Sequence, residues 1–534
     1  MSDIGNVRHQ TEDTHMSAAA AQPDAGRTAG VNANAVLAIV AVAQFMVILD
    51  ASIVNVALPT IKRDVGFSEQ SLSWILNAYT LIFGGFLLLG GRLADRLGRR
   101  RLFMAGIALF SLASLICGVS QSEGELLLAR GFQGLGAAMV SPAALSIILT
   151  TFAEGRERNR ALAVWGAIAG AGGAVGLLLG GVLVQLLSWR WMFFVNVPIG
   201  VAVLALAPRI IPESRSESAA KSYDVQGAVA ITLGTMALVF TLIKADSWGW
   251  TSARTIAGFV VAAVLIVAFV VIERGHDDPL VPLRIFSNRS LAASDATMLL
   301  VVAALFGMFF FVTLYLQQVL RYSALKSGLA YLPLSLTLIG ASGVASQFVE
   351  RFTPKPILVA GLLIATGGFV LLTSVSGHGD YASHVLPAMI ILGVGFGMSF
   401  VPITIAATSG VAPGDSGLAS GLLNTTQQVG GSLGLAILSS VSTSRTTSAL
   451  HAGQSLPAAL THGFTGAFVV AGILCVLGAV VAITLLPSRH RETADEDVEM
   501  VALSFAGCPG APYCGHLARV VAFGRRVRTR LARS

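Results

Sequence analysis

The stretch Leu49-Asp50-Ala51-Ser52-Ile53-Val54-Asn55-Val56-Ala57-Leu58-Pro59 decides the fold, because it places an acid within an apolar segment. The preceding run from Ala35 to Leu49 carries no charge, so Asp50 lies at membrane depth if this segment crosses a bilayer. A carboxylate there costs roughly 2.5–3.5 kcal/mol on insertion scales, and such residues usually serve a function. Nothing else in the segment can neutralise Asp50. Its partner or its proton must come from another part of the chain.

The composition is that of a membrane protein. The 534 residues are 54% hydrophobic and 12% charged, whereas soluble proteins carry about 25% charged residues. The net charge of +7 does not indicate a nucleic-acid partner, because the basic residues fall mainly in short loops and in the C-terminal tail. Residues 1–33 lack the apolar core of a signal peptide, so we expect the first segment to remain as an uncleaved signal-anchor.

The lengths of the apolar segments predict fourteen transmembrane helices. A bilayer core of about 30 Å requires about 20 apolar residues in a helix. The predicted limits are 34–57, 71–91, 102–120, 125–149, 161–185, 191–208, 224–244, 255–273, 290–316, 328–349, 355–375, 384–408, 417–441 and 463–486. We therefore predict an all-α membrane protein.

The same limits predict the domain organisation. The predicted parts are a cytoplasmic N-terminal tail (1–33), a six-helix half (34–208), a linker with two extra transmembrane helices (209–289), a second six-helix half (290–486) and a basic tail (487–534). Lys and Arg favour the cytoplasmic side. With residue 1 inside, the short cytoplasmic loops hold sixteen of them and the outer loops eight. Both termini are then cytoplasmic, and the Arg-rich C-terminal tail either lies on anionic lipid or is solvated.

Internal similarity supports two related halves. The segment Gly91–Arg100 follows the second span, and Ser346–Lys355 follows the second span of the later half with its acid–Arg pair in register. Glycine-rich runs also precede Pro142 and Pro402 in the fourth span of each half. Weak internal symmetry of this kind is typical of transporters with a binding site near the bilayer midplane.

Four motifs together resemble the fourteen-span drug:proton antiporters of the major facilitator superfamily. They are Asp50–Pro59, the loop Gly91–Arg101, Arg130 with Gln133, and Trp189–Gly200, and the resemblance covers about residues 35–486. It implies a major facilitator fold, a location in the cytoplasmic membrane, and efflux of drugs or antibiotics by alternating access, which confers resistance. It also implies the proton gradient as the energy source and no cofactor. We expect a monomer whose partners are the small-molecule substrate, protons and lipid.

Arg130 is the predicted partner of Asp50. It lies in the early part of the fourth span with no acid within four residues, so it must pair, hydrate or snorkel. Both residues are expected toward the outer side, because the first span ends there and the fourth begins there. The resemblance assigns this arginine to proton transfer or to tuning the carboxylate; the alternative is simple snorkelling. Burial favours a neutral carboxyl and a nearby cation favours its anion, so a change of surroundings would couple protonation to conformation.

Two further motifs bear on the conformational change. The loop after the second span contains two glycines that favour a tight turn, Gly91 and Gly98. The same loop, at the cytoplasmic membrane edge, contains Asp95, Arg96 and Arg99. The resemblance implies that this loop is a gate latch that holds the two halves in one state. The alternative is that the arginines only set the membrane topology, but this does not explain Asp95. In the fifth span, small residues allow close packing, and the glycines of the expected antiporter motif are Gly172, Gly176, Gly180 and Gly181. Leu177 stands where the family has a proline, which puts the expected kink in doubt.

Buried polar residues supply candidates for a substrate cavity. They are Gln44, Asn55, Gln133, Asp295, Gln317, Asn424 and Gln427. Interhelical hydrogen bonding is the commoner role of such residues. Asp295, about five residues into its span, is also a candidate for a second titrating site.

Two other functions are alternatives to drug efflux. A dedicated exporter of one metabolite or self-made antibiotic would have the same fold, and the sequence does not distinguish it. A membrane-embedded enzyme or primary pump is disfavoured, because no Lys follows a Gly as a Walker A nucleotide site requires. We expect no metal, since no His pair has metal-ligand spacing.

Overall fold

The computed structural model describes residues 32–487 apart from 69–70, 153–155, 216–223, 277–278, 377–378, 410 and 412–415. The predicted tails, 1–33 and 487–534, lie almost wholly outside these residues. Within the described part every regular element is helical. The first bundle contains α1 (Ala33–Val65), α2 (Trp74–Leu97), α3 (Arg99–Val119), α4 (Glu123–Thr151), α5 (Arg156–Leu186), α6 (Trp191–Phe194) and α7 (Asn196–Ile210). Two further helices follow, α8 (Val225–Trp248) and α9 (Ala253–Gly275).

The second bundle follows the short helix η1 (Leu283–Ser287). It contains α10 (Arg289–Leu314) with the π-helical turn η2 (Tyr315–Val319), α11 (Ala324–Ala330), α12 (Leu332–Arg351), α13 (Pro354–Leu372), the π-helical turn η3 (Tyr381–Val385), α14 (Leu386–Thr408), α15 (Ser416–His451) and α16 (Leu456–Leu485). Twelve segments of the described chain are long and apolar enough to cross a membrane. With α5 and α15, which pack inside the bundles, they make the fourteen predicted spans.

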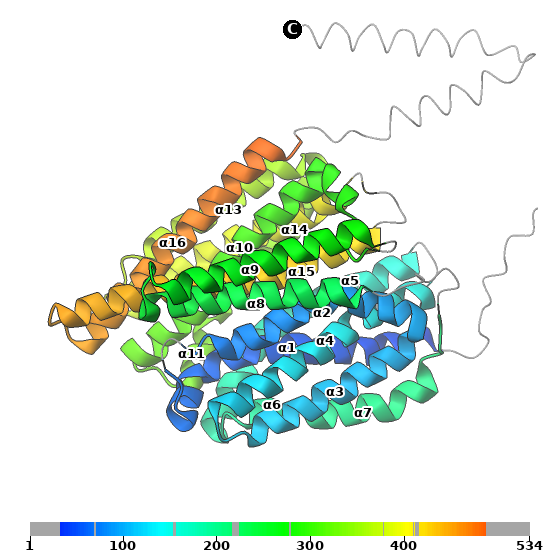
Figure 1. The fold of residues 1–534 in the computed structure, drawn as a ribbon, viewed down its shortest axis with the longest axis horizontal. Coiled ribbons are helices and arrows are strands. Elements are labelled where there is room, and N and C mark those ends of the chain that lie inside the picture. Colours follow the sequence, from blue (N-terminus) through cyan, green and yellow to red (C-terminus); the bar gives the residue numbers. More distant parts are fainter. Residues whose placement is uncertain are drawn as a thin grey trace, which may run out of the picture.

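The two bundles repeat one packing scheme (Figure 1). In the first, α2 and α3 pack on α4, and α1 packs on α5; in the second, α12 and α13 pack on α14, and α10 packs on α15. The extra helix α8 lies against α2 and α15, one helix from each bundle, and α9 packs on α8. The predicted major facilitator architecture of two six-helix halves and two central helices is confirmed.

The first helix is longer than predicted. The sequence predicts an end at residue 57, but α1 passes through Pro59 and ends at Val65. Gly66 then adopts a positive φ of 89° and donates its N–H to the carbonyl of Lys62, a common helix terminus that favours glycine. Asp50 consequently lies near the middle of α1 and not near its end.

The predicted glycine motif makes one face of α5 nearly flat against α1. A Cβ on Gly172 would lie 2.8 Å from Cγ2 of Ile48, and one on Gly180 would lie 2.9 Å from the carbonyl oxygen of Ile53. At Gly176 the Oγ of Ser52 fills the space, and that hydroxyl donates to the carbonyl of Gly172 at 3.3 Å. Close backbone approach gives van der Waals contact that larger residues would prevent.

The fourth glycine of the motif serves a different contact. A Cβ on Gly181 would lie 2.9 Å from the carbonyl oxygen of Ala324, so this residue lets α5 approach α11 of the second bundle. The carbonyl oxygen of Leu177 similarly lies 2.6 Å from the Cβ position of Gly328. With leucine at position 177, α5 continues as one helix to Leu186.

Substitution of Gly180 by alanine tests the α1–α5 contact. Because its Cβ would meet the backbone of Ile53, we expect Gly180→Ala to destabilise the protein by about 1–3 kcal/mol and to lower its thermal unfolding midpoint in detergent. The matched control is Gly173→Ala on the same helix, where no atom lies within 4 Å of the new Cβ. There the midpoint should stay or rise, since alanine favours helix. Equal midpoints for both variants would contradict the packing account.

Candidate functional site

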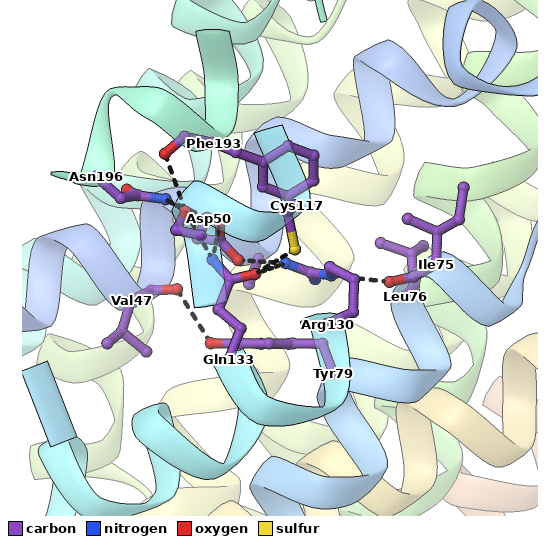
Figure 2. Close-up of polar contacts among 12 residues, drawn as sticks. Val47, Asp50, Ile75, Leu76, Tyr79, Cys117, Arg130, Gln133, Phe193 and Asn196 are labelled. Carbon is purple, nitrogen blue, oxygen red and sulfur yellow. Dashed lines mark hydrogen bonds and ion pairs between the residues drawn. The ribbon is translucent and has the colours of Figure 1, made fainter. Parts of the chain in front are cut away.

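A buried ion pair between Asp50 and Arg130 forms the centre of the candidate site (Figure 2). Both residues have no exposed surface, and Nη1 of Arg130 lies 2.5 Å from Oδ2 of Asp50. The predicted pairing of these residues is therefore present in the structure. Removing two charges from water costs several kcal/mol per ion, so this arrangement requires good geometry and further hydrogen bonds.

Two amides supply those further hydrogen bonds to the carboxylate. Nε2 of Gln133 donates to Oδ1 of Asp50 at 2.7 Å, and Nδ2 of Asn196 donates to the same oxygen at 3.0 Å. Both amides also donate to Oγ of Ser114, at 3.2 Å and 3.0 Å. That hydroxyl donates in turn to the carbonyl of Phe193 at 2.9 Å. The network thus joins α1, α3, α4, α6 and α7.

Arg130 is fixed by contacts on several sides. Its Nε donates to the carbonyl of Ile75 at 3.0 Å, and Nη1 also donates to Oε1 of Gln133 at 2.9 Å. Its Cζ lies 4.4 Å from the centre of the Tyr79 ring, a distance at which a cation is attracted to an aromatic face. Nη2 has no hydrogen-bond partner among the described residues. These contacts rule out snorkelling, since the guanidinium has no exposed surface.

The sequence indicated only part of this network. Asp50, Arg130 and Gln133 stood out as polar residues in apolar spans. Asn196 lay inside the quoted motif Trp189–Gly200 but was not identified as a site residue, although it too is an isolated amide in an apolar segment. Ser114 gave no signal, because serine is common in membrane helices.

A large cavity lies between the two bundles. Its volume is about 1470 Å³, and α1, α2, α4 and α5 line it from one side, with α10 and α15 on the other. At one end the lining reaches the turns at the predicted cytoplasmic ends of the helices, with Arg92, Arg99 and Thr150. Arg130 and Tyr79 contribute to its wall, whereas Asp50 is not among the lining residues. The arginine therefore stands between the carboxylate and the cavity.

The predicted cavity residues divide into two groups. Gln44, Asn55, Asn424 and Gln427 line the cavity as predicted. The other three, Gln133, Asp295 and Gln317, are not among its lining residues. Gln133 belongs to the Asp50 network, Gln317 contacts the first bundle and Asp295 is buried within the second. A polar residue within an apolar segment can be recognised from the sequence. The sequence does not indicate which side of the helix faces the cavity.

Contacts between the bundles close the end of the cavity opposite the Arg92–Arg99 turn. Nε2 of Gln317 donates to the carbonyl of Val56 at 2.8 Å, which joins the π-helical turn η2 to α1. The α5–α11 contact at Gly181 and Gly328 lies at the same end of the two bundles. Such π-helical turns re-aim side chains and are frequent at functional sites.

The predicted gate loop makes its described contacts within the first bundle and with the linker. Gly98 has a φ of 109°, and its missing Cβ leaves room for Oε1 of Glu213. Glu213 lies 3.7 Å from Nε of both Arg100 and Arg101 and accepts from the N–H of Arg100 at 3.2 Å. The N–H of Arg99 donates to the carbonyl of Ser214 at 3.0 Å.

Arg92 and Gly91, at the start of the predicted loop, contact the linker and α4. A guanidinium N–H of Arg92, between Gly91 and Asp95, donates to the carbonyl of Pro279. Gly91 packs near Pro142, at 3.7 Å from the position of its missing Cβ. The side chain of Asp95 lies outside the described residues, so the latch role that the resemblance gives to Asp95 and Arg96 stays a prediction. Glu213 was missed because it follows the sixth span and belongs to no quoted motif.

Among the described residues no group of His, Cys, Asp or Glu is arranged to hold a metal.

Removal of Arg130 tests the coupling of the pair. The variant Arg130→Met leaves a buried carboxylate without its cation, which should cost about 3–5 kcal/mol and lower the thermal unfolding midpoint in detergent. Adding Asp50→Asn to that variant should restore part of the loss, because the uncompensated charge is removed. Arg254→Met, at an exposed position in the first turn of α9, is the matched control. If the two single effects simply add in the double variant, the residues are not coupled.

Comparison with known proteins places the chain in a family. The Major Facilitator Superfamily model matches residues 40–435. The puromycin resistance protein pur8 of Streptomyces alboniger is 42% identical over 487 residues, which cover 90% of this chain and 95% of that protein. The cephamycin export protein CmcT of Amycolatopsis lactamdurans is 38% identical over 473 residues, covering 88% and 96%.

Solved transporter structures share the fold. A bacterial homologue of the human lysosomal transporter Spinster, in an inward-facing and unoccupied conformation, has a TM-score of 0.61 at 17% identity and covers 86% of this chain and 98% of that chain. The peptide transporter POT in complex with sulfate has a TM-score of 0.62 at 16% identity, covering 85% and 96%. The family match covers most of the chain, and the two sequence relatives align over nearly all of it. The chain therefore belongs to the Major Facilitator Superfamily and is a multi-pass membrane transporter.

Proposed function

We propose that this protein exports an antibiotic or drug across the cytoplasmic membrane in exchange for protons, and so confers resistance. The observation that carries the proposal is the buried Asp50–Arg130 pair, whose arginine also lines a cavity large enough for a drug-sized molecule. Sequence relatives named for puromycin resistance and cephamycin export support the choice of antibiotics as substrates.

The cavity geometry suggests which state of the cycle the structure represents. The cavity reaches the ends of the helices that carry Arg92 and Arg99, and Gln317 bridges to α1 at the opposite end. If Lys and Arg mark the cytoplasmic side, this is an inward-facing state ready to take up substrate. Both termini would then be cytoplasmic.

Asp50 supplies the proposed coupling through its contacts with two other helices. In the present state the charged carboxylate accepts hydrogen bonds from Arg130, Gln133 and Asn196, which hold α1 against α4 and α7. A proton on Asp50 would remove the charge that Arg130 neutralises and weaken this connection. A proton taken up from outside would therefore discharge the substrate, and its release inside would reset the transporter.

Arg130 and Tyr79 give the substrate a direct path to the same switch. Both residues line the cavity, and the guanidinium stacks on the Tyr79 ring. A substrate bound against them would change the environment of the cation that holds Asp50. Competition between substrate and proton can thus arise without contact between the substrate and the carboxylate.

The cavity wall favours an amphipathic substrate. Aromatic and apolar residues such as Phe83, Trp165 and Phe309 alternate with the neutral polar groups of Gln44, Asn55, Asn424 and Gln427. Apolar walls with a few polar anchors are typical of small-molecule sites. The site lies within one chain, so we propose a monomer embedded in lipid that needs no cofactor beyond the proton gradient and no nucleic acid.

A dedicated exporter of one compound is the second candidate function. It is favoured by relatives whose names each specify a single antibiotic, including puromycin, cephamycin and tetracenomycin C. A multidrug function is favoured by the relative named multidrug resistance protein Stp, from Mycobacterium tuberculosis, at 36% identity over 74% of this chain and 73% of that protein. A panel of toxic compounds tested on cells that express the protein separates the two.

Export by the Asp50→Asn variant tests the proposed function. Cells expressing the wild-type protein should exclude puromycin or another compound of the panel and lose this protection when the pH gradient is collapsed. We expect Asp50→Asn to abolish uphill export, because an amide cannot carry a proton through the cycle. Glu125→Gln is the control, since Glu125 is an exposed acid whose carboxylate accepts from the N–H of Gln121. Uphill, gradient-dependent export by Asp50→Asn would refute the proposal.

A further inference from the structure

Asp295 is a second buried acid, and it lies in the other half of the molecule. Its side chain is 6% exposed, and neither Oδ1 nor Oδ2 has a hydrogen-bond partner among the described residues. The adjacent Ser294 is fully buried and its hydroxyl also lacks a partner. Asp50, by contrast, accepts three hydrogen bonds from side chains and pairs with a cation. The two acids therefore have opposite environments in the same conformation.

The surroundings of Asp295 contain no nearby counter-charge. The helices packed against α10 are α14, α15 and α16, with smaller contacts from α1 and η1. Their charged or titratable groups, with those of α10 itself, are Arg445, His451, His462, Cys475, Asp50, Lys62, Arg63, Asp64, Arg284 and Arg289. Arg445 lies about 28 Å further along the α10–α15 contact, by the helical rise of about 1.5 Å per residue. Arg284 and Arg289 are exposed at the start of α10, and Asp50 is paired with Arg130.

An ionised carboxylate without a donor is costly in such a place, so the neutral acid is the form that this conformation favours. Asp295 lies six residues after the start of α10, or about 9 Å into the helix. A proton on Asp295 therefore belongs to the inward-facing state, in which the Asp50 carboxylate is fully hydrogen-bonded.

A route to another state exists one helical turn away. Nε2 of Gln427, which lines the cavity, lies 3.7 Å from Sδ of Met298, a weak acceptor. Helix α15 approaches α10 here, since a Cβ on Gly430 would lie 2.7 Å from the carbonyl oxygen of Leu299. If α15 slid slightly along α10, the Gln427 amide would leave the thioether of Met298 and donate to the Asp295 carboxyl instead.

We propose that Asp295 is a second proton-binding residue of the transport cycle, neutral in the substrate-free inward-facing state and deprotonated when, with the cavity still open to the cytoplasm, α15 moves and Gln427 turns to it. The proposal rests on the proposed proton-coupled export. In that step the O–H bond of the carboxyl breaks, the proton passes through water in the cavity to the cytoplasm, and the Gln427 amide donates to the resulting carboxylate. A proton taken up from outside in the outward-facing state restores the neutral acid, so this proton moves in the same direction as the one on Asp50. The protein would then carry one titrating acid in each half.

Two measurements test the proposal, and the first needs no transport. Infrared spectra of the purified protein should contain a carbonyl stretching band of a protonated carboxylic acid at neutral pH. We expect Asp295→Asn to lose this band, whereas Glu125→Gln should keep it. An unchanged band in Asp295→Asn overturns the proposal.

The second measurement is the proton-to-substrate ratio in proteoliposomes, taken from the pH gradient that just balances an imposed puromycin gradient. We expect Asp295→Asn to exchange one proton fewer per puromycin than wild type, and Asp295→Glu to restore the wild-type ratio. A wild-type ratio in Asp295→Asn overturns the proposal even if the infrared band is lost. That result would mean that Asp295 of the wild-type protein stays protonated throughout the cycle and carries no proton. If wild-type protein moves puromycin without protons, the proposed export mechanism fails instead, and the proposal built on it falls with it.

Discussion

The ion pair between Asp50 and Arg130 is the interaction on which the rest of the first bundle depends. Two fully buried charges 2.5 Å apart are tolerable only because Gln133, Asn196 and the carbonyl of Ile75 complete their hydrogen bonds. These groups come from different helices, so the pair constrains the position of α1 relative to α2, α4 and α7. A charge change on one carboxyl would be felt by all of them. That makes the pair suited to a switch, whereas an apolar contact of the same size would give more stability and no response to protons.

Close packing between glycine-lined helices allows the two bundles to meet and still separate. Gly172, Gly176 and Gly180 fix α5 to α1 inside one bundle, while Gly181 and Gly328 form the contact with the other. The second contact is made largely of backbone and small side chains. Two hydrogen bonds lie nearby, from Gln317 to the carbonyl of Val56 and from the N–H of Leu325 to Oε1 of Gln185. Few strong interactions must break for the closed end to open. The same helix α5 can therefore be rigid on one face and separable on the other.

The sequence predicted the architecture closely and the site incompletely, for a physical reason. Bilayer thickness sets helix length, so the apolar segments gave all fourteen spans, and two unpaired charges in apolar surroundings identified Asp50 and Arg130 as partners. The predicted end of α1 at residue 57 was wrong, because bilayer thickness sets only the length of the apolar part and the helix continues past Pro59 to Val65. Gln133 and Gln317 were recognised as unusual but assigned to the cavity, because which face of a helix meets the cavity depends on packing between helices. Ser114 and Glu213 were missed because neither is chemically exceptional where it stands.

Substrate and proton should compete through Asp50, and proton release on substrate binding measures this competition most directly. Puromycin, or another exported compound, is added to the purified protein in weakly buffered detergent solution while a pH indicator is followed. At a pH low enough for Asp50 to carry its proton in the free protein, the wild-type protein should release protons on binding, and the Asp50→Asn variant should release up to one proton equivalent fewer while it still binds the compound. Equal release from the two proteins would contradict the central role assigned to the Asp50–Arg130 pair.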